Sequence, residues 1–258
     1  MEEIRLQAEK AVRETARIFL NSELDKSLVM QKGIHNYVTH IDYEVQNFLL
    51  EELNKIIPGS NIITEESGEN KFSLDKPTWI LDPVDGTSNL MRDYRHSAVS
   101  LALFIEGTSV LALIYNPYSN EMFVGQAGKG AFLNNERIRV SDKADMEDCM
   151  VAFGTTPYNR SQAHRTFEIA EKVFKQCLDI RRSGSAALDI AYVACGRCDA
   201  FFEFNLQPWD YAAGILILKE AGGQITNWHG ETPSILHSES ILATNGLVHD
   251  EMMSFLTV

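Results

Sequence analysis

The chain has 258 residues and a formal net charge of −13, from 23 lysines and arginines against 36 aspartates and glutamates. This length can bury a hydrophobic core, and 45% hydrophobic residues exclude the collagen-like, disordered and disulfide-scaffold classes. The acidity disfavours nucleic acid or an anionic membrane as the main partner, because clustered lysine and arginine bind both. Taken alone, it also makes a phosphorylated substrate unexpected.

The sequence favours a cytoplasmic location. No apolar run approaches the ~20 residues of a membrane-spanning helix, and the charged segment 1–20 does not resemble a signal peptide. So few cysteines in a chain of this size predict reduced thiols. The pair Cys195-x-x-Cys198 has no second pair to complete a zinc site, so we expect structural thiols; the remaining cysteines are Cys149 and Cys177.

Two helices are predicted in the first part of the chain. Apolar residues recur with a helical period over 2–20 and over 42–57. Thr39, followed three residues later by Asp42, matches a capping box at the start of the second helix. Pro58 and Gly59 end that helix.

The middle of the chain predicts a mostly antiparallel sheet over roughly 60–140. The segment GQAGKG (125–130) matches neither common phosphate-loop spacing, so we expect a loop leading into a strand. Short β-rich segments occupy 78–82, 97–105, 109–115 and 121–125, and a turn at 116–120 separates the last two.

After residue 148, strands and helices alternate, which indicates an α/β layer. Residues 1–148 and 149–258 are therefore expected to form an α+β half and an α/β half of one compact unit. Strands are predicted at 149–153, 199–204, 224–227 and 240–244, and helices at 161–177, 184–196, 210–221 and the C-terminus.

Carboxylates follow the apolar strand 79–81 in an unusual setting. Asp82 and Asp85 lie three residues apart on one turn, where they repel each other unless a cation lies between them. The amides of Gly86 and Thr87 are free to face an anion, so the turn could serve phosphate-ester hydrolysis. An aspartate-rich turn with local hydrogen bonds is the alternative. A covalent aspartyl mechanism is disfavoured, because Val84 occupies the nucleophile position of the D-x-D-G-T pattern.

Two other acidic segments support a site. Glu65 and Glu66 follow the apolar segment 62–64, and Asp210 is expected to open a helix. A solvated loop edge and a helix N-cap are the respective alternatives. Three acid-bearing ends of strands or helices are harder to explain in this way than one.

The chain resembles the inositol monophosphatase family of magnesium-dependent, lithium-sensitive sugar phosphatases, and its 181–214 region is most similar to the bacterial inositol-1-phosphatase branch. The matching segments are KGIHNYVTHID (32–42), ITEES (63–67), WILDPVDGTSN (79–89), RRSGSAALDIA (181–191), PWDYAAG (208–214) and EAGG (220–223).

The resemblance implies a layered αβαβα sandwich of the sugar-phosphatase type, usually dimeric, with its site between the two halves and most metal ligands in the first. It implies two to three Mg²⁺ ions. Glu65, Asp82 and the Val84 carbonyl are expected to hold the first ion. Asp82, Asp85 and Asp210 are expected to hold the second. A third, more weakly bound ion is expected to contact Glu65.

The resemblance also implies catalytic and substrate-binding roles. Thr87, hydrogen-bonded to Asp42, is expected to help deprotonate the attacking water, with Glu65 in the catalytic set. The Gly86 and Thr87 amides are expected to bind phosphate. The other expected substrate contacts are Glu203, Gly184, Ser185, Ala186 and Asp210.

The implied reaction is hydrolysis of inositol monophosphate without a covalent intermediate. Fructose 1,6-bisphosphate, a nucleotide 3′-phosphate and histidinol phosphate are the alternative substrates, and Glu203 favours a polyol because a carboxylate accepts hydrogen bonds from hydroxyls. A non-catalytic protein of the same fold is disfavoured, because every expected metal ligand and Thr87 are present.

Several positions depart from the family pattern. Asn36 stands where many relatives have Asp, which weakens the expected surroundings of the third ion, and Leu90 replaces Phe. Arg92, Arg95 and His96 occupy a stretch where relatives often carry Phe-Pro. This stretch is either a solvated loop or places Arg95 at the substrate entrance, where it would accept a second anionic group.

Overall fold

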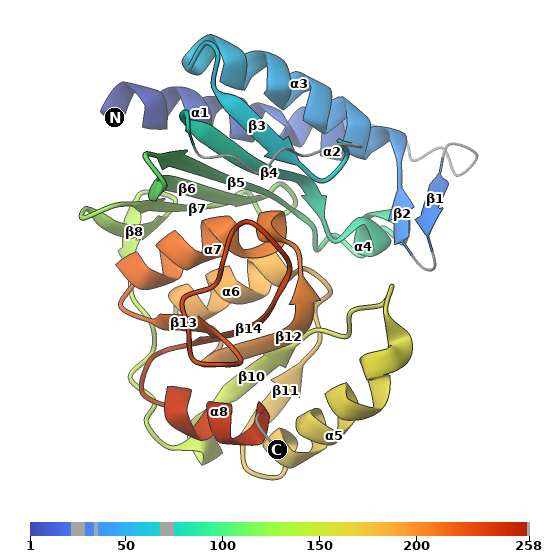
Figure 1. Ribbon diagram of the computed structural model, residues 1–258, viewed down its shortest axis with the longest axis vertical. Coiled ribbons are helices and arrows are strands. Elements are labelled where there is room, and N and C mark those ends of the chain that lie inside the picture. The colour runs from blue at the N-terminus through green and yellow to red at the C-terminus, as the bar shows by residue number, and fades with distance from the viewer. Residues whose placement is uncertain (22–28, 34–35, 68–74, 257–258) are drawn as a thin grey trace.

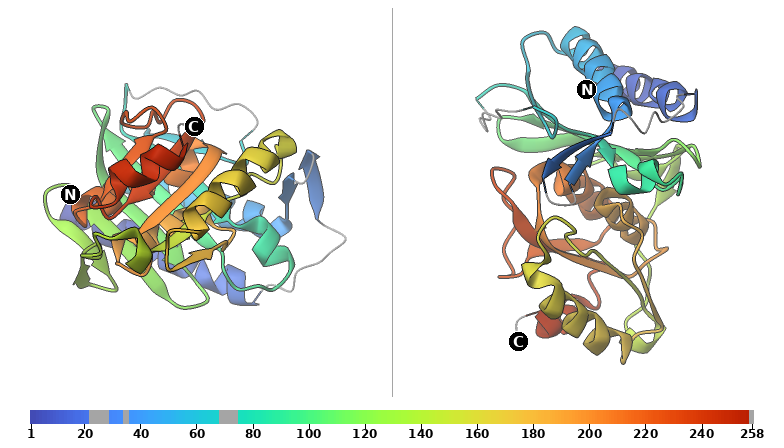
Figure 2. Two further views of the ribbon diagram at one scale, coloured as in Figure 1. Left: turned by 90° about the horizontal axis from the view of Figure 1, so that it is seen from below. Right: turned by 90° about the vertical axis from the view of Figure 1, so that its right-hand side faces the viewer.

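The computed structural model has five layers, in which helices and sheets alternate (Figures 1 and 2). It describes residues 1–21, 29–33, 36–67 and 75–256. The helices are α1 (Glu2–Glu14), α2 (Ala16–Asn21), α3 (His40–Ile56), α4 (Thr87–Met91), α5 (Ala163–Phe174), α6 (Ala186–Ala194), α7 (Pro208–Glu220) and α8 (His249–Leu256). The first strands are β1 (Met30–Gly33), β2 (Asn36–Val38), β3 (Asn61–Thr64), β4 (Thr78–Asp85), β5 (Ala98–Ile105), β6 (Thr108–Asn116) and β7 (Glu121–Gln126). The later strands are β8 (Gly130–Leu133), β9 (Glu136–Ile138), β10 (Met150–Phe153), β11 (Asp179–Arg181), β12 (Ala200–Leu206), β13 (Gln224–Asn227) and β14 (Glu239–Thr244).

The first sheet has seven strands in the order β3-β4-β5-β6-β7-β8-β9. Only β3 and β4 pair in parallel, so the predicted antiparallel sheet over roughly 60–140 is confirmed. Alternate residues of β4 serve different layers: Trp79 and Leu81 pack with α1 and α3, whereas Ile80 packs with α6 and α7. This two-residue period is the reason why a fully buried strand can join two hydrophobic cores.

The second sheet has five strands in the order β11-β10-β12-β14-β13. Phe201 of β12 points into the core shared with α6 and α7, and Phe202 points into the core under α5 and α8. Figure 1 shows α6 and α7 between the two sheets. The expected αβαβα sandwich is therefore confirmed.

Most predicted elements are present, with shifts at their ends. The Thr39–Asp42 capping box is present and α3 follows it. The helix predicted over 161–177 is shorter, because a 3₁₀ turn over 160–162 precedes α5. Asp210 does not open its helix: Gln207 is the N-cap of α7, and Pro208 supplies the first turn. The β1–β2 hairpin, α4, β9 and β11 were not predicted from the sequence.

The cysteines carry no linkage or metal cluster in the described part of the chain. All four are free thiols, and burial raises the pKa of Cys195 and, to about 12, that of Cys198. Structural thiols at the Cys-x-x-Cys segment are therefore consistent with the fold.

No described helix is both long enough and apolar enough to cross a membrane.

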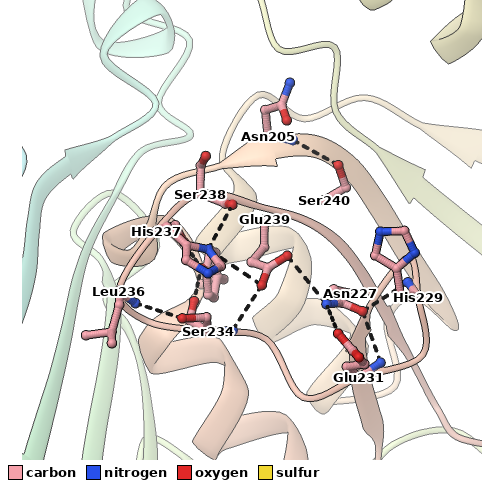
Figure 3. Close-up of polar contacts among 11 residues, drawn as sticks. Asn205, Asn227, His229, Glu231, Ser234, Leu236, His237, Ser238, Glu239 and Ser240 are labelled. Atoms are coloured by element: carbon pink, nitrogen blue, oxygen red, sulfur yellow. Dashed lines mark hydrogen bonds and ion pairs between the residues drawn. The ribbon is translucent and has the colours of Figure 1, made fainter.

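The connection between β13 and β14 is held by its own polar residues (Figure 3). The Asn227 side-chain oxygen accepts hydrogen bonds from the backbone N–H groups of His229 (2.9 Å) and Glu231 (3.0 Å). The buried Tyr211 hydroxyl donates to the carbonyl oxygens of Ser234 and His237. Because Tyr211 follows Asp210 on α7, these bonds also fix the start of that helix.

Candidate active site

Three buried aspartates from two separate elements converge. Asp82 and Asp85 come from the end of β4, and Asp210 comes from the first turn of α7. One carboxylate oxygen from each lies within 4.8 Å of the others. Among the described residues, no other group of three or more acidic, histidine or cysteine side chains lies so close together. Such an all-oxygen donor set is the kind that Mg²⁺ binds.

Burial and mutual repulsion make these acids unusually basic. Burial is the main cause of the raised pKa of Asp82, and Glu65, Asp85 and Asp210 add to it. Burial also raises the pKa of Asp85 to about 6, against hydrogen bonds that lower it. Burial is also the main reason why the pKa of Asp210 lies well above its ordinary value. A divalent cation would relieve this repulsion, so the residues present fit a metal site.

Hydrogen bonds fix each carboxylate. Asp85 Oδ2 accepts from Ser185 Oγ (2.5 Å) and from the Ala187 backbone N–H (2.8 Å), both at the start of α6. Asp210 Oδ2 accepts from the Gln207 N–H at 2.7 Å, which is half of the capping box of α7. Asp82 Oδ1 accepts from the Val84 N–H at 2.9 Å. The N-terminal turns of α6 and α7 therefore orient the carboxylates of Asp85 and Asp210.

Thr87 connects this site to α3. Its hydroxyl lies 3.0 Å from Asp42 Oδ1 and 3.2 Å from the Val84 carbonyl oxygen. Asp42 Oδ2 accepts from the Thr39 backbone N–H (2.9 Å), so one carboxylate caps α3 and bonds to Thr87. Burial raises the pKa of Asp42 to about 6. Asp42 therefore lies behind Thr87 rather than in the cavity wall.

Gly86 is required by its surroundings. It has φ +94°, and a Cβ there would lie 3.1 Å from the carbonyl oxygens of Gly184 and His96. The left-handed backbone and the close approach of the two chain segments both favour glycine. The turn that carries the N–H groups of Gly86 and Thr87 therefore packs directly on the second half of the chain.

Lys32 on β1 reaches the acids after β3. Its Nζ lies 3.0 Å from Glu65 Oε1 and 2.7 Å from Glu66 Oε1. Burial nevertheless raises the pKa of Glu66 to about 7. Glu65 is therefore already paired with an ammonium group, and a cation bound there would have to share it or displace it.

One cavity of about 390 Å³ is lined by Lys32, Glu65, Thr87 and the three aspartates. On its second side, Glu203 Oε1 accepts from the Thr156 N–H at 2.9 Å, and burial raises the pKa of Glu203 to about 7. A Cβ on Gly154 would lie 1.8 Å from Glu203 Oε2, so only glycine leaves room for this carboxylate. Of the residues expected from the sequence, the cavity wall contains Glu65, Asp82, Val84, Asp85, Gly86, Thr87, Gly184, Ser185, Ala186, Glu203 and Asp210.

The cavity also contains residues that the sequence analysis did not single out: Lys32, Tyr37, Tyr158, Arg182, Asp189, Gln207 and Trp209. Lys32 and Arg182 could have been identified as site residues from the sequence, because they lie in the segments 32–42 and 181–191 that match the family. Arg95 is not in the cavity wall; it is exposed and its Nε lies 3.1 Å from Asp93 Oδ1. Arg92 and His96 are likewise outside the described wall, and the side chain of Asn36 lies outside the described residues.

Sequence and structure comparisons identify relatives over nearly the whole chain. The matching family is described as the inositol monophosphatase family, over residues 1–256. The chain is 41% identical to Nus factor SuhB of Escherichia coli K12, covering 87% of this chain and 84% of that protein. It is 38% identical to inositol-1-monophosphatase of Caulobacter vibrioides, covering 96% and 97%.

Solved structures agree. Extragenic suppressor protein SuhB from Bartonella henselae has a TM-score of 0.90 at 35% identity, covering 98% of this chain and 97% of that one. Inositol monophosphatase II of Staphylococcus aureus, solved with inositol monophosphate, has a TM-score of 0.82 at 25% identity, covering 98% and 94%. The same S. aureus protein has also been solved with 2′-AMP.

Proposed function

This chain belongs to the inositol monophosphatase family and is a phosphatase, and from that premise we propose that it is a Mg²⁺-dependent phosphomonoesterase acting on inositol monophosphate. The products are inositol and inorganic phosphate. Fructose 1,6-bisphosphate or another small sugar or nucleotide phosphate is the alternative substrate.

The observation that carries the proposal is the convergence of Asp82, Asp85 and Asp210 within 4.8 Å in a cavity large enough for a small phosphate ester. Buried acids this close destabilise a fold unless a cation binds them. Their presence together is difficult to explain as a structural feature.

In this proposal, Glu65, Asp82 and the Val84 carbonyl would hold the first Mg²⁺ ion, and Asp82, Asp85 and Asp210 would hold the second. When bound, the ions neutralise the phosphate and make water a better nucleophile. The Lys32 ammonium, 3.0 Å from the Glu65 carboxylate, would compete with any ion that Glu65 holds. A third ion, for which Glu65 is the one expected ligand, would therefore bind more weakly than the first, which Asp82 and the Val84 carbonyl would also hold.

The chain itself positions water and phosphate. The Thr87 hydroxyl donates to Asp42, so its oxygen is free to accept a hydrogen bond from the attacking water. Asp42, with its raised pKa, is suited to take up the proton. The N–H groups at the first turn of α4, from Gly86 and Thr87, have no partner inside the helix and can donate to phosphate oxygens.

Glu203 supports a polyol leaving group. Its carboxylate lies in the cavity wall and is held by the Thr156 N–H. There the carboxylate can accept hydrogen bonds from hydroxyls. Gly184, Ser185 and Ala186 line the adjacent wall. The S. aureus relative binds both inositol monophosphate and 2′-AMP, which supports inositol monophosphate and keeps a nucleotide as the alternative.

The cavity wall contains residues of both 1–148 and 149–258, which supports one catalytic unit with its site between the two halves. The free cysteines support a cytoplasmic location. A homodimer is proposed from the family resemblance.

The test is release of inorganic phosphate from inositol 1-phosphate with Mg²⁺ and with EDTA. We expect release only with Mg²⁺, loss of release in Asp82→Asn, and normal release in Asp142→Asn, an exposed aspartate. Near-normal turnover by Asp82→Asn, or turnover in EDTA, would contradict the metal assignment. Comparing kcat/KM for inositol 1-phosphate, fructose 1,6-bisphosphate and 2′-AMP decides between the substrates.

A further inference from the structure

Two cationic side chains lie among the described residues of the active-site cavity, and they differ in their partners. Lys32 is paired with Glu65 and Glu66. Arg182 has no ion pair with any described residue; its Nη2 donates to the Thr155 hydroxyl at 2.9 Å. Arg182 therefore brings a positive charge that the protein itself does not directly neutralise.

The backbone of the neighbouring turn makes room for this guanidinium. Gly184 has φ +93°, and a Cβ there would lie 2.7 Å from Arg182 Nη1. Thr155 holds the other end of the guanidinium. Arg182 is exposed as a residue, but its guanidinium lies between the 183–185 turn and the segment after β10, where Thr155 holds it.

This position is on the side of the cavity where Glu203 is proposed to contact the leaving group. The charge of Arg182 lowers the pKa of both Glu203 and Asp189, against the larger opposite effect of burial. Both carboxyls line the same cavity. Arg182 is therefore a neighbour of the residue proposed to contact the sugar hydroxyls.

We propose that Arg182 binds a second anionic group, a phosphate or carboxylate on the leaving group, and so extends this phosphatase from inositol monophosphate to small bisphosphates, including nucleotides that carry a second phosphate. Arginine suits this role because its planar donors bind such groups in pairs. Thr155 takes one N–H of Nη2, which leaves the other four N–H groups of the guanidinium as donors. The proposal rests on the phosphatase activity proposed above and moves to Arg182 the role that the sequence suggested for Arg95.

The experiment compares fructose 1,6-bisphosphate with inositol 1-phosphate at saturating Mg²⁺, in wild type, Arg182→Gln, Arg182→Lys and Arg181→Gln. Arg181 is the matched control, because it is exposed on β11 and paired with Asp179 outside the cavity. Since hydrogen bonds to charged groups are worth about 1.5–3 kcal/mol, the bisphosphate-to-monophosphate ratio of kcat/KM should fall about 10- to 100-fold in Arg182→Gln. Most of this fall should come from KM for the bisphosphate.

Arg182→Lys should restore part of the ratio, because it restores the charge, and Arg181→Gln should leave the ratio unchanged. An unchanged ratio in Arg182→Gln, with both substrates equally affected, would show a structural role and overturn the inference. A wild-type enzyme that hydrolyses inositol 1-phosphate but not the bisphosphate would overturn it as well. Loss of all phosphate release in wild type would instead refute the proposed function.

Discussion

Replacing Asp85 by asparagine should stabilise the metal-free protein while it removes metal binding. Asp85 is buried, and its pKa is raised to about 6 from an ordinary 3.8. Because a tenfold change in proton affinity is worth ~1.4 kcal/mol, the ionised carboxylate costs the folded state about 3 kcal/mol above pH 7. Asparagine removes this charge, and its side-chain oxygen can still accept from Ser185 and Ala187.

The effect depends on pH with a definite sign. The folded-state pKa lies above the unfolded one, so the penalty is absent below about pH 4 and grows until the pH passes about 6. For a chain of this size, 1 kcal/mol shifts Tm by roughly 2–4 °C, so Asp85→Asn should raise Tm by up to about 6–12 °C at pH 8. At pH 5 the gain in stability should be about half as large.

The assay is calorimetric unfolding in EDTA at pH 8 and pH 5, repeated at pH 8 with Mg²⁺. Asp142→Asn is the control, because it removes an exposed aspartate and should leave Tm almost unchanged. With Mg²⁺, wild type should gain stability and Asp85→Asn should gain little, since a metal ligand is lost. A variant no more stable than wild type in EDTA at pH 8, or a gain equal at both pH values, would refute the reasoning.

Three further predictions concern the same cavity. Mg²⁺ at about 100 times its Kd should stabilise the wild-type protein by ~2.7 kcal/mol; no Tm shift at millimolar Mg²⁺ in a thermal scan would contradict a preformed site. Gly154→Ala should raise KM for inositol 1-phosphate and lower Tm, because its Cβ would lie 1.8 Å from Glu203 Oε2. Steady-state kinetics measure the first effect, and an unchanged KM would show that Glu203 does not contact the substrate. Lys32→Gln should lower Tm in EDTA and enlarge the Mg²⁺-induced Tm shift, because Glu65 and Glu66 lose their cation. An equal Mg²⁺-induced shift in wild type and variant would show that the Lys32 ammonium does not compete with the metal.

The sequence alone predicted the elements whose pattern is local. The helical period of α3 with its Thr39–Asp42 cap, and the strands of the first sheet other than β9, follow from side-chain periodicity and turn residues. The short β1–β2 hairpin and β11 were not predicted, because three or four residues carry too little periodicity. The start of α7 was misplaced because an acidic residue suits both the N-cap and the third position of a helix, and the Gln207–Asp210 capping box occupies the latter.

The site divides in the same way. The sequence alone placed Asp82 and Asp85 on a turn after a strand and marked Asp210 as unusual, and family resemblance grouped them. In the structure both Asp82 and Asp85 lie on β4 itself, which runs to Asp85 and has an irregular register between them. Only the tertiary structure brought Asp210 within 4.8 Å of the other two, because α6 and α7 pack between the sheets with their first turns at the end of β4. It also decided that Arg182 rather than Arg95 lines the cavity. A local pattern fixes which side chains lie close together along one segment, but only packing decides which segments meet.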